Sequence, residues 1–135
     1  MNIKAAIVFH SAGTQFSTTS TSFVDLLSQI GGSTISISIV KASGSTNLLV
    51  LGSTACLGGP ETVTLAVNDG TTDTNIAQNR TRTQCNTPVV GEVLVTGLAA
   101  GTYTMKLRVK TAAGSSVGWT LNAVSSSISV MEVAP

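Results

Sequence analysis

The side chains that most often carry out chemistry are few and widely spaced in this sequence. His10 is the only histidine, so a nucleophile activated by histidine could be built in one way only. The six acidic side chains show no near pair in an apolar stretch, the arrangement that separates two pKa values for acid and base catalysis. The phosphate-binding pattern G-x-x-x-x-G-K-[ST] is absent. We therefore expect a protein that is not an enzyme and binds no cofactor, with His10 as a strand-end residue.

Two other sets of residues are weak candidates for a metal site or a disulfide. Asp69 and Asp73 flank Gly70 with a spacing that resembles part of a calcium-binding loop, but no glutamate follows them, so a solvated turn is the better interpretation. Cys56 and Cys85 lack the additional ligands of a structural zinc site. We interpret them as two separate buried thiols; the alternative is a disulfide that closes a loop of about 29 residues. The sequence therefore predicts no metal site.

Two pairs of side chains are candidates for contact with a partner molecule. Trp119 and Tyr103 would form a sugar-binding platform if their rings were exposed, but both lie in register with aliphatic neighbours, so we expect core packing. Arg80 and Arg82 could contact an acidic surface, although ordinary loop charges are the simpler interpretation.

The composition limits the classes of function. The 135 residues suit one domain, which we expect to span residues 1–135. The net charge is +1 and charged residues make up 10% of the chain, against about a quarter in a usual protein. Nucleic-acid binding needs clustered cations, so we expect no nucleic-acid partner. No run of about 18 apolar residues is present, so we expect no membrane span. The apolar run Ala5–Phe9 is shorter than a signal-peptide core, so we expect a chain that folds in the cytoplasm with Met1 as its start.

Hydrophobic periodicity predicts an all-β fold. In Tyr103–Lys110, apolar and polar residues alternate, which is the period-two pattern of a strand with one buried and one exposed face. Turn-forming residues, most of them glycines, separate this run from its neighbours. We therefore expect eight or nine short strands in an antiparallel β-sandwich or barrel. The other predicted strands are Ile3–Phe9, Phe16–Val24, Ser33–Val40, Leu48–Leu51, Glu61–Val67, Val89–Thr96, Val117–Ala123 and Ser127–Val133.

Two segments depart from this pattern. The spacing of Phe23, Leu26, Leu27 and Ile30 fits one face of a short helix. The preceding residues are poor in helix formers, so an apolar strand end followed by a loop is preferred. The polar segment Asp69–Pro88 is predicted to be a long loop, and the Asp-Gly pair at its start favours a type I′ turn.

The scarcity of charge predicts self-association. The chain has 17 Ser and 20 Thr, so small hydroxyl groups line the solvent faces where charges usually keep copies apart. These groups lose water at modest cost and can hydrogen-bond across a contact. The apolar runs Asn47–Leu51 and Val89–Val95 do not alternate strictly, which predicts burial on both faces. A single sandwich cannot bury both faces of a strand, so we expect a homo-oligomer, most simply a closed ring.

Three stretches carry a resemblance to a known family. They are Thr21–Leu26 (TSFVDL), Gly97–Val109 (GLAAGTYTMKLRV) and Ser127–Val133 (SISVMEV). Together they resemble small jelly-roll modules in the virions of tailed bacteriophages, which are similar to the trimeric heads of tumour-necrosis-factor-like proteins. The resemblance implies a jelly-roll-like sandwich that forms a homotrimer, with the strand that contains Glu132 in a central sheet.

The same resemblance implies a function. Such modules either cover the capsid as decoration (cement) proteins or form the tips of tail fibres, and none of this kind is an enzyme. The chain has no coiled coil or shaft repeat, which favours a decoration protein that is assembled in the host cytoplasm and binds the major capsid protein on the virion surface. The alternative is a tail-fibre or receptor-binding module that recognises host surface glycans. The candidate contact residues are Ile3, Lys4, Phe9, His10, Arg80, Arg82 and Thr83.

Overall fold

Two main antiparallel sheets and a small third one form the described part of the protein. The computed structural model of the chain describes residues 3–10, 17–27, 33–54, 57–58, 61–76, 80–82, 89–119 and 124–135. Its regular elements are all strands, and every pair of neighbouring strands is antiparallel, which confirms the predicted fold class. The described residues include no helix that is long and apolar enough to span a membrane. Cys56 and Cys85 lie outside the described residues.

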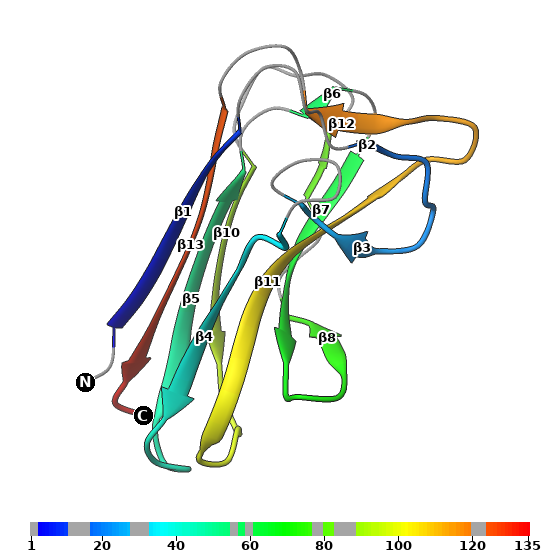
Figure 1. Ribbon diagram of the computed structural model, residues 1–135. Helices are drawn as coiled ribbons and strands as arrows, with labels where there is room; N and C mark the ends of the chain where they lie inside the picture. Colours follow the sequence, from blue (N-terminus) through cyan, green and yellow to red (C-terminus); the bar gives the residue numbers. More distant parts are fainter. Residues whose placement is uncertain are drawn as a thin grey trace.

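The first sheet has four strands in the order β1-β13-β5-β10 and forms one side of the molecule (Figure 1). Its strands are β1 (Ile3–His10), β13 (Val124–Val133), β5 (Asn47–Thr54) and β10 (Val89–Val95). The strand that contains Glu132, β13, lies between β1 and β5, which agrees with the central place that the resemblance implied.

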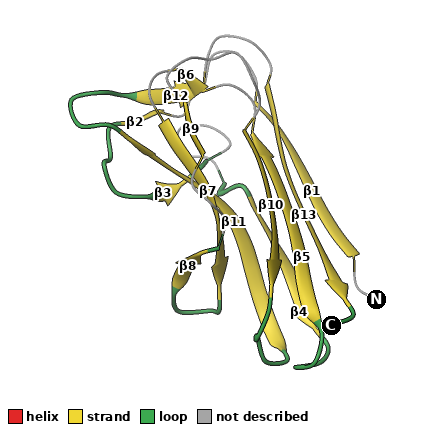
Figure 2. Ribbon diagram, turned by 180° about the vertical axis from the view of Figure 1, so that it is seen from behind, coloured by secondary structure: helices red, strands yellow, loops and turns green. Residues whose placement is uncertain are grey.

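The second sheet has six strands and faces the first. Its path is β3-β11-β7-β8, with β4 also paired to β11 and β9 also paired to β7. A small third sheet, in the order β2-β12-β6, lies at one end of the sandwich (Figure 2). The strands of the second sheet are β3 (Val24–Asp25), β4 (Ser36–Lys41), β7 (Glu61–Asn68), β8 (Asp73–Asn75), β9 (Arg80–Arg82) and β11 (Gly101–Thr111). Those of the third are β2 (Ser17–Thr18), β6 (Leu57–Gly58) and β12 (Val117–Trp119).

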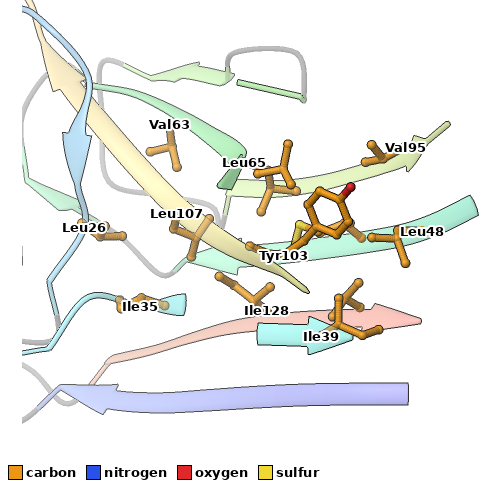
Figure 3. Close-up of a cluster of buried hydrophobic side chains, with 14 of the residues drawn as sticks. Leu26, Ile35, Ile39, Leu48, Val63, Leu65, Val95, Tyr103, Leu107 and Ile128 are labelled. Carbon is orange, nitrogen blue, oxygen red and sulfur yellow. The ribbon is translucent and has the colours of Figure 1, made fainter. Parts of the chain in front are cut away.

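The core lies between the two main sheets, and β11 shows how it forms. Tyr103, Met105, Leu107 and Val109 are all at least nine-tenths buried, as the alternation predicts. Figure 3 shows Tyr103 pointing into the same interior space as Leu48 of the opposite sheet. Burial of each aliphatic side chain of this size contributes about 1.5–3 kcal/mol, which makes this alternation the main determinant of the sandwich.

A glycine in β5 lies close to side chains of the opposite sheet. Gly52 lies opposite Gly91 in β10 and Ile128 in β13, and it faces the core. A Cβ at this position would collide with the side chain of Leu65 and would lie 3.3 Å from Cδ2 of Leu107. Because Gly52 has no side chain, the side chain of Leu65 can occupy the space above it.

The strand pattern differs from the prediction in number and in one segment. The described residues form thirteen strands rather than eight or nine, because six of them are short pairings of only two or three residues. The predicted strand Phe16–Val24 is wrong: its described part holds β2 and β3 with a turn between them. The Ser20 hydroxyl donates to the carbonyl of Ser22 at 2.7 Å, and the Ser20 amide donates to the Thr18 hydroxyl at 3.1 Å. Hydroxyls that bond to nearby backbone compete with the strand ladder and interrupt it.

The segment Asp69–Pro88 is also not one long loop, since β8 and β9 both pair with β7. Polar side chains do not prevent backbone pairing at a sheet edge. Four residues, 69–72, join β7 to β8 in place of a two-residue type I′ turn. Oδ1 of Asp69 accepts the amides of Thr71 and Thr72 at 2.9 Å, and Gly70 has a φ of 103°, which favours glycine. Thr83–Pro88 lies outside the described residues.

The helix considered for Phe23–Ile30 does not form over its described part. Val24 and Asp25 belong to β3, and Leu27 makes an isolated bridge with Thr34. The preferred interpretation, a strand end and its loop, is confirmed as far as residue 27.

Candidate interaction surface

The outer face of the six-stranded sheet carries a cluster of compensated charges. Lys106 Nζ lies 3.1 Å from Asp25 Oδ2 and 3.0 Å from Asp73 Oδ1. Arg108 Nε forms an ion pair with Asp25 Oδ1 at 3.2 Å, although the two atoms are not aligned as a hydrogen bond. The guanidinium also donates to the carbonyl of Phe23 at 2.8 Å. Two cations therefore neutralise two carboxylates.

Strand pairing explains this cluster, which corrects the sequence-based view of the acidic residues as scattered. Asp25 lies opposite Arg108 in the β3–β11 ladder, and Asp73 opens β8 beside β7. Burial raises the pKa of Asp73, but hydrogen bonds from Asn68 and Lys106 hold it below its ordinary value. Burial lowers the pKa of Lys106, but hydrogen bonds to Asp73 and Asp25 hold it above its ordinary value. Both shifts favour the charged forms of Asp73 and Lys106, which suits a structural role rather than proton transfer.

The rest of this face is polar. The hydroxyls of Ser38 and Thr104 form an exposed hydrogen bond at 2.8 Å between β4 and β11. Lys110 Nζ lies 4.9 Å from the centre of the Phe23 ring, within the range of a cation–π contact. Val40, near the end of β4, is apolar and 61% exposed.

The outer face of the four-stranded sheet has a different character. Leu49 in the middle of this face lies opposite Met131 of β13 on one side and Leu94 of β10 on the other. Leu94 is 52% exposed, and the other two side chains are partly exposed. Leu51 and Val133 alternate onto the same face and are also partly exposed. We name these five residues, Leu49, Leu51, Leu94, Met131 and Val133, the apolar patch.

Hydroxyl groups continue this face beyond the apolar patch. Ser129 lies opposite Leu51, and Ser127 lies opposite Ser53. Glu92, on the other side of Leu51, is exposed and is the only ionisable group among the outward side chains that the structure describes on this sheet. Burial was predicted for both faces of Asn47–Leu51. The side that faces the core is buried, as predicted. Burial of the outer side requires a partner and stays a prediction.

A shallow pocket lies at the end of the sandwich, where β13 meets the turn after β4. It is lined by Ala42, Ser43, Thr46, Glu132, Val133 and Ala134. Glu132 accepts hydrogen bonds from the Ala42 and Ser43 amides and from the Thr46 hydroxyl, and the buried Lys41 donates to the Ser43 carbonyl. The Thr46 hydroxyl and then the Ala42 amide hold the pKa of Glu132 below its ordinary value. The pocket wall therefore holds a carboxylate that is already satisfied by the chain itself.

The structure separates the predicted contact residues into two groups. Ile3, Lys4, Phe9 and His10 belong to β1, at the edge of the four-stranded sheet, whereas Arg80 and Arg82 belong to β9 in the other sheet. Their side chains and the whole of Thr83 lie outside the described part of the structure. The apolar patch is a site that the sequence alone did not reveal, although the loss of strict alternation in β5 and β10 was its signal.

The aromatic prediction is confirmed for Tyr103, which is 9% exposed and donates its hydroxyl to the Ala99 carbonyl at 3.1 Å. The side chain of Trp119 lies outside the described residues.

One sequence pattern not considered above is Gly114–Gly118, which fits the G-x-S-x-G of a nucleophile elbow. An elbow needs a strand, a sharp turn and a helix, with the serine in the turn. Here Gly114, with a φ of 75°, lies in the turn between two strands, β11 and β12. This geometry does not build an elbow around Ser116. Nor do three His, Cys, Asp or Glu side chains of the described ranges come together as metal ligands.

Comparisons with known proteins support the fold. No family model matches the chain, and no curated protein matches it. Among solved structures, a C-terminal domain described as "EclA C-terminal domain; sugar-binding protein" matches 97% of this chain and 79% of its own length, with a TM-score of 0.50 and 10% identity. A structure of infectious bursal disease virus matches 98% of this chain at 11% identity and a TM-score of 0.48, and this chain spans about a third (32%) of that one. The CBM22-1 xylan-binding domain from Paenibacillus barcinonensis matches 93% of this chain and 90% of its own, at 8% identity and a TM-score of 0.46. At 10% identity, the match to the sugar-binding domain supports the β-sandwich fold and nothing further.

Proposed function

We propose that this chain is a structural virion protein: a capsid decoration protein that binds the outer capsid surface as a homotrimer and stabilises the contacts between capsomers. The observation that carries the proposal is the composition of the two outer faces. On the six-stranded sheet, Asp25 and Asp73 are neutralised by Lys106 and Arg108, whereas the four-stranded sheet presents partly exposed leucines, a methionine and serine hydroxyls. The outer face of the four-stranded sheet is not built to stay isolated in water and suits contact with other protein surfaces.

The mechanism would be mechanical. A shell under internal pressure fails when neighbouring capsomers separate. A trimer that bridges them adds binding free energy that must be lost before they part, and three linked copies gain avidity from individually weak contacts. No bond is made or broken, so the proposal requires no catalytic residue and no cofactor.

The test compares virions assembled with and without this chain. The release of packaged DNA on heating is followed with an intercalating dye, and purified protein is then added back to the deficient particles. Release at a lower temperature without the chain, restored by addition, is the expected result. Equal release temperatures for both particles would overturn the proposal.

The second candidate is a receptor-binding module that recognises host surface glycans. The exposed Ser38–Thr104 hydroxyl pair favours it, since such groups exchange hydrogen bonds readily with sugars. Tyr103, by contrast, is in the core and cannot stack on a sugar ring. Binding of the purified chain to a glycan array, lost in Thr104→Val, would favour this candidate over the first.

A further inference from the structure

We infer that the outer face of the four-stranded sheet is the surface through which copies of this chain associate, with the apolar patch at its centre. The inference rests on the proposed function, because it names the face that would make the trimer. The partner is therefore a second copy of this chain.

The first argument is the continuity of the apolar patch. Met131, Leu49 and Leu94 form one row across three neighbouring strands, because they are directly opposite one another in the ladders. The register places Ile3 of β1 opposite Met131, at the next position of this row. In Figures 1 and 2 the four-stranded sheet is the outermost layer on its side, and no described strand covers it. A contiguous apolar row without a covering layer is typical of an interaction site.

The second argument is electrostatic. The six-stranded sheet has Asp25, Asp73, Lys106, Arg108 and Lys110 on its outer side. The described outward side chains of the four-stranded sheet include one ionisable group, Glu92, at the border of the apolar patch. A copy of the same face can approach it with little desolvation of charge, since depletion of charge at the centre is the signature of an interface core.

The third argument is size. The four strands have 7 to 10 residues, which corresponds to lengths of about 23–33 Å, and together they span about 19 Å across. The face therefore covers about 500 Å² before the relief of its side chains is counted. A standard stable interface buries about 800 Å² on each partner. In a ring each copy divides this face between two contacts, so a single contact is smaller than that. Association therefore depends on closure of the ring, in which every copy is held by two contacts at once.

The arrangement of the patch fits a closed ring. Leu94 lies on β10, which is an edge strand, and Met131 lies one strand from the opposite edge. When the β10 half of one copy contacts the β13 half of the next, the interface is heterologous, and three such contacts close a ring around a threefold axis. Each copy then uses both halves of the face, and no apolar row is left open.

Two exposed apolar residues provide a matched test. Leu94→Lys places a charge on the apolar patch, and Val40→Lys places the same charge on the outer face of the other sheet, at a side chain that is 61% exposed. Sedimentation velocity of the full chain should give a three-chain particle for the wild type and for Val40→Lys. Leu94→Lys should raise the dissociation constant at least about 30-fold, as expected for loss of a central contact. Met131→Lys, on the other half of the face, should do the same.

Circular dichroism establishes whether each variant is folded. If one of the two apolar-patch variants does not fold, the other still tests the inference. A trimer that persists in both Leu94→Lys and Met131→Lys would overturn the inference while leaving the proposed function standing, and dissociation by Val40→Lys alone would do so as well. A wild-type monomer would overturn both. Trimers that require the apolar patch but leave virion stability unchanged would support the inference and contradict the proposed function.

Discussion

Both carboxylate oxygens of Glu132 accept a hydrogen bond from the backbone amide of Ala42, at 3.1 and 3.2 Å. Ala42 follows the last residue of β4 in the six-stranded sheet, and Glu132 belongs to β13 in the four-stranded sheet. The Ser43 amide and the Thr46 hydroxyl donate to the same carboxylate. One side chain therefore joins the two sheets at the end of the sandwich where the chain makes its turn into β5.

This clamp should make the fold sensitive to acid. The Thr46 hydroxyl and the Ala42 amide hold the pKa of Glu132 below the ordinary 4.5. Because the folded-state pKa is depressed, the stabilisation is complete above that value and is lost as the pH falls through the folded pKa. Glu132→Gln should lower the free energy of unfolding at neutral pH and reduce its further loss in acid, measured by urea unfolding across the pH range. The exposed Glu92→Gln is the control and should behave as the wild type. Equal acid sensitivity in Glu132→Gln and wild type would show that the clamp is not the cause.

Removal of the Lys106 charge should destabilise the charge cluster, whereas removal of the Lys110 charge should not. Lys106→Met leaves Asp25 and Asp73 with only Arg108 to neutralise them, so we expect a loss of about 1 kcal/mol in the free energy of unfolding. The pKa of Asp73 should rise, since its burial remains while a hydrogen bond is removed. NMR titration of the carboxyl carbons measures that shift. Lys110→Met, which removes a contact with an aromatic ring instead, is the control and should leave the pKa of Asp73 in place. An unchanged pKa of Asp73 in Lys106→Met would contradict the assignment.

The raised pKa of Lys106 gives a matching prediction in alkali. Its ion pairs contribute stability below the ordinary value of 10.5, and this contribution is lost as the pH rises through the higher folded-state pKa. Unfolding of the wild type should therefore become easier at the alkaline end of the range, and Lys106→Met should lack this component.

Close approach of the sheets at Gly52 should make that glycine intolerant of a methyl group. Gly52→Ala forces Leu65 to move inside a packed core and should cost about 1–3 kcal/mol. Gly44→Ala is the control, because its Cβ would meet only Ala99 and Ala100 at 3.9 Å, and we expect a change within about 0.5 kcal/mol. Urea unfolding of the two variants measures the difference. If both cost the same, Leu65 does not occupy the space over Gly52.

The buried hydroxyl of Tyr103 should contribute more than an exposed one. Tyr103→Phe removes the hydrogen bond to the Ala99 carbonyl at the edge of the core and should cost about 1 kcal/mol. Ser38→Ala removes an exposed hydroxyl pair and should stay within about 0.5 kcal/mol. A larger cost for Ser38→Ala would contradict this ranking.

The long strands were predictable because their information is local. Alternation in Tyr103–Lys110 predicts which side chains face inward, and the structure buries those residues in β11. The short strands β8 and β9 were not predictable, because they exist only through pairing with β7, and their polar sequences carry no periodic signal. In the same way the turn within Phe16–Val24 depends on hydroxyls that bond to their own backbone.

The candidate surface was predictable in part. Loss of alternation in Asn47–Leu51 indicated a second apolar face, and Leu49 and Leu51 do form one. The row that joins Leu49 to Leu94 and Met131 depends on strand order and register, which arise from distant pairings. The ion pairs of Asp25 and Asp73 with Lys106 likewise depend on pairing between strands that are distant in the sequence.

The claim that exposed apolar surface on the four-stranded sheet exists for self-association is tested most directly by the mass of the native particle. Native mass spectrometry of the wild-type chain at micromolar concentration should show three copies of the 13.7 kDa chain. A particle that remains a single chain throughout the concentration range would contradict the account.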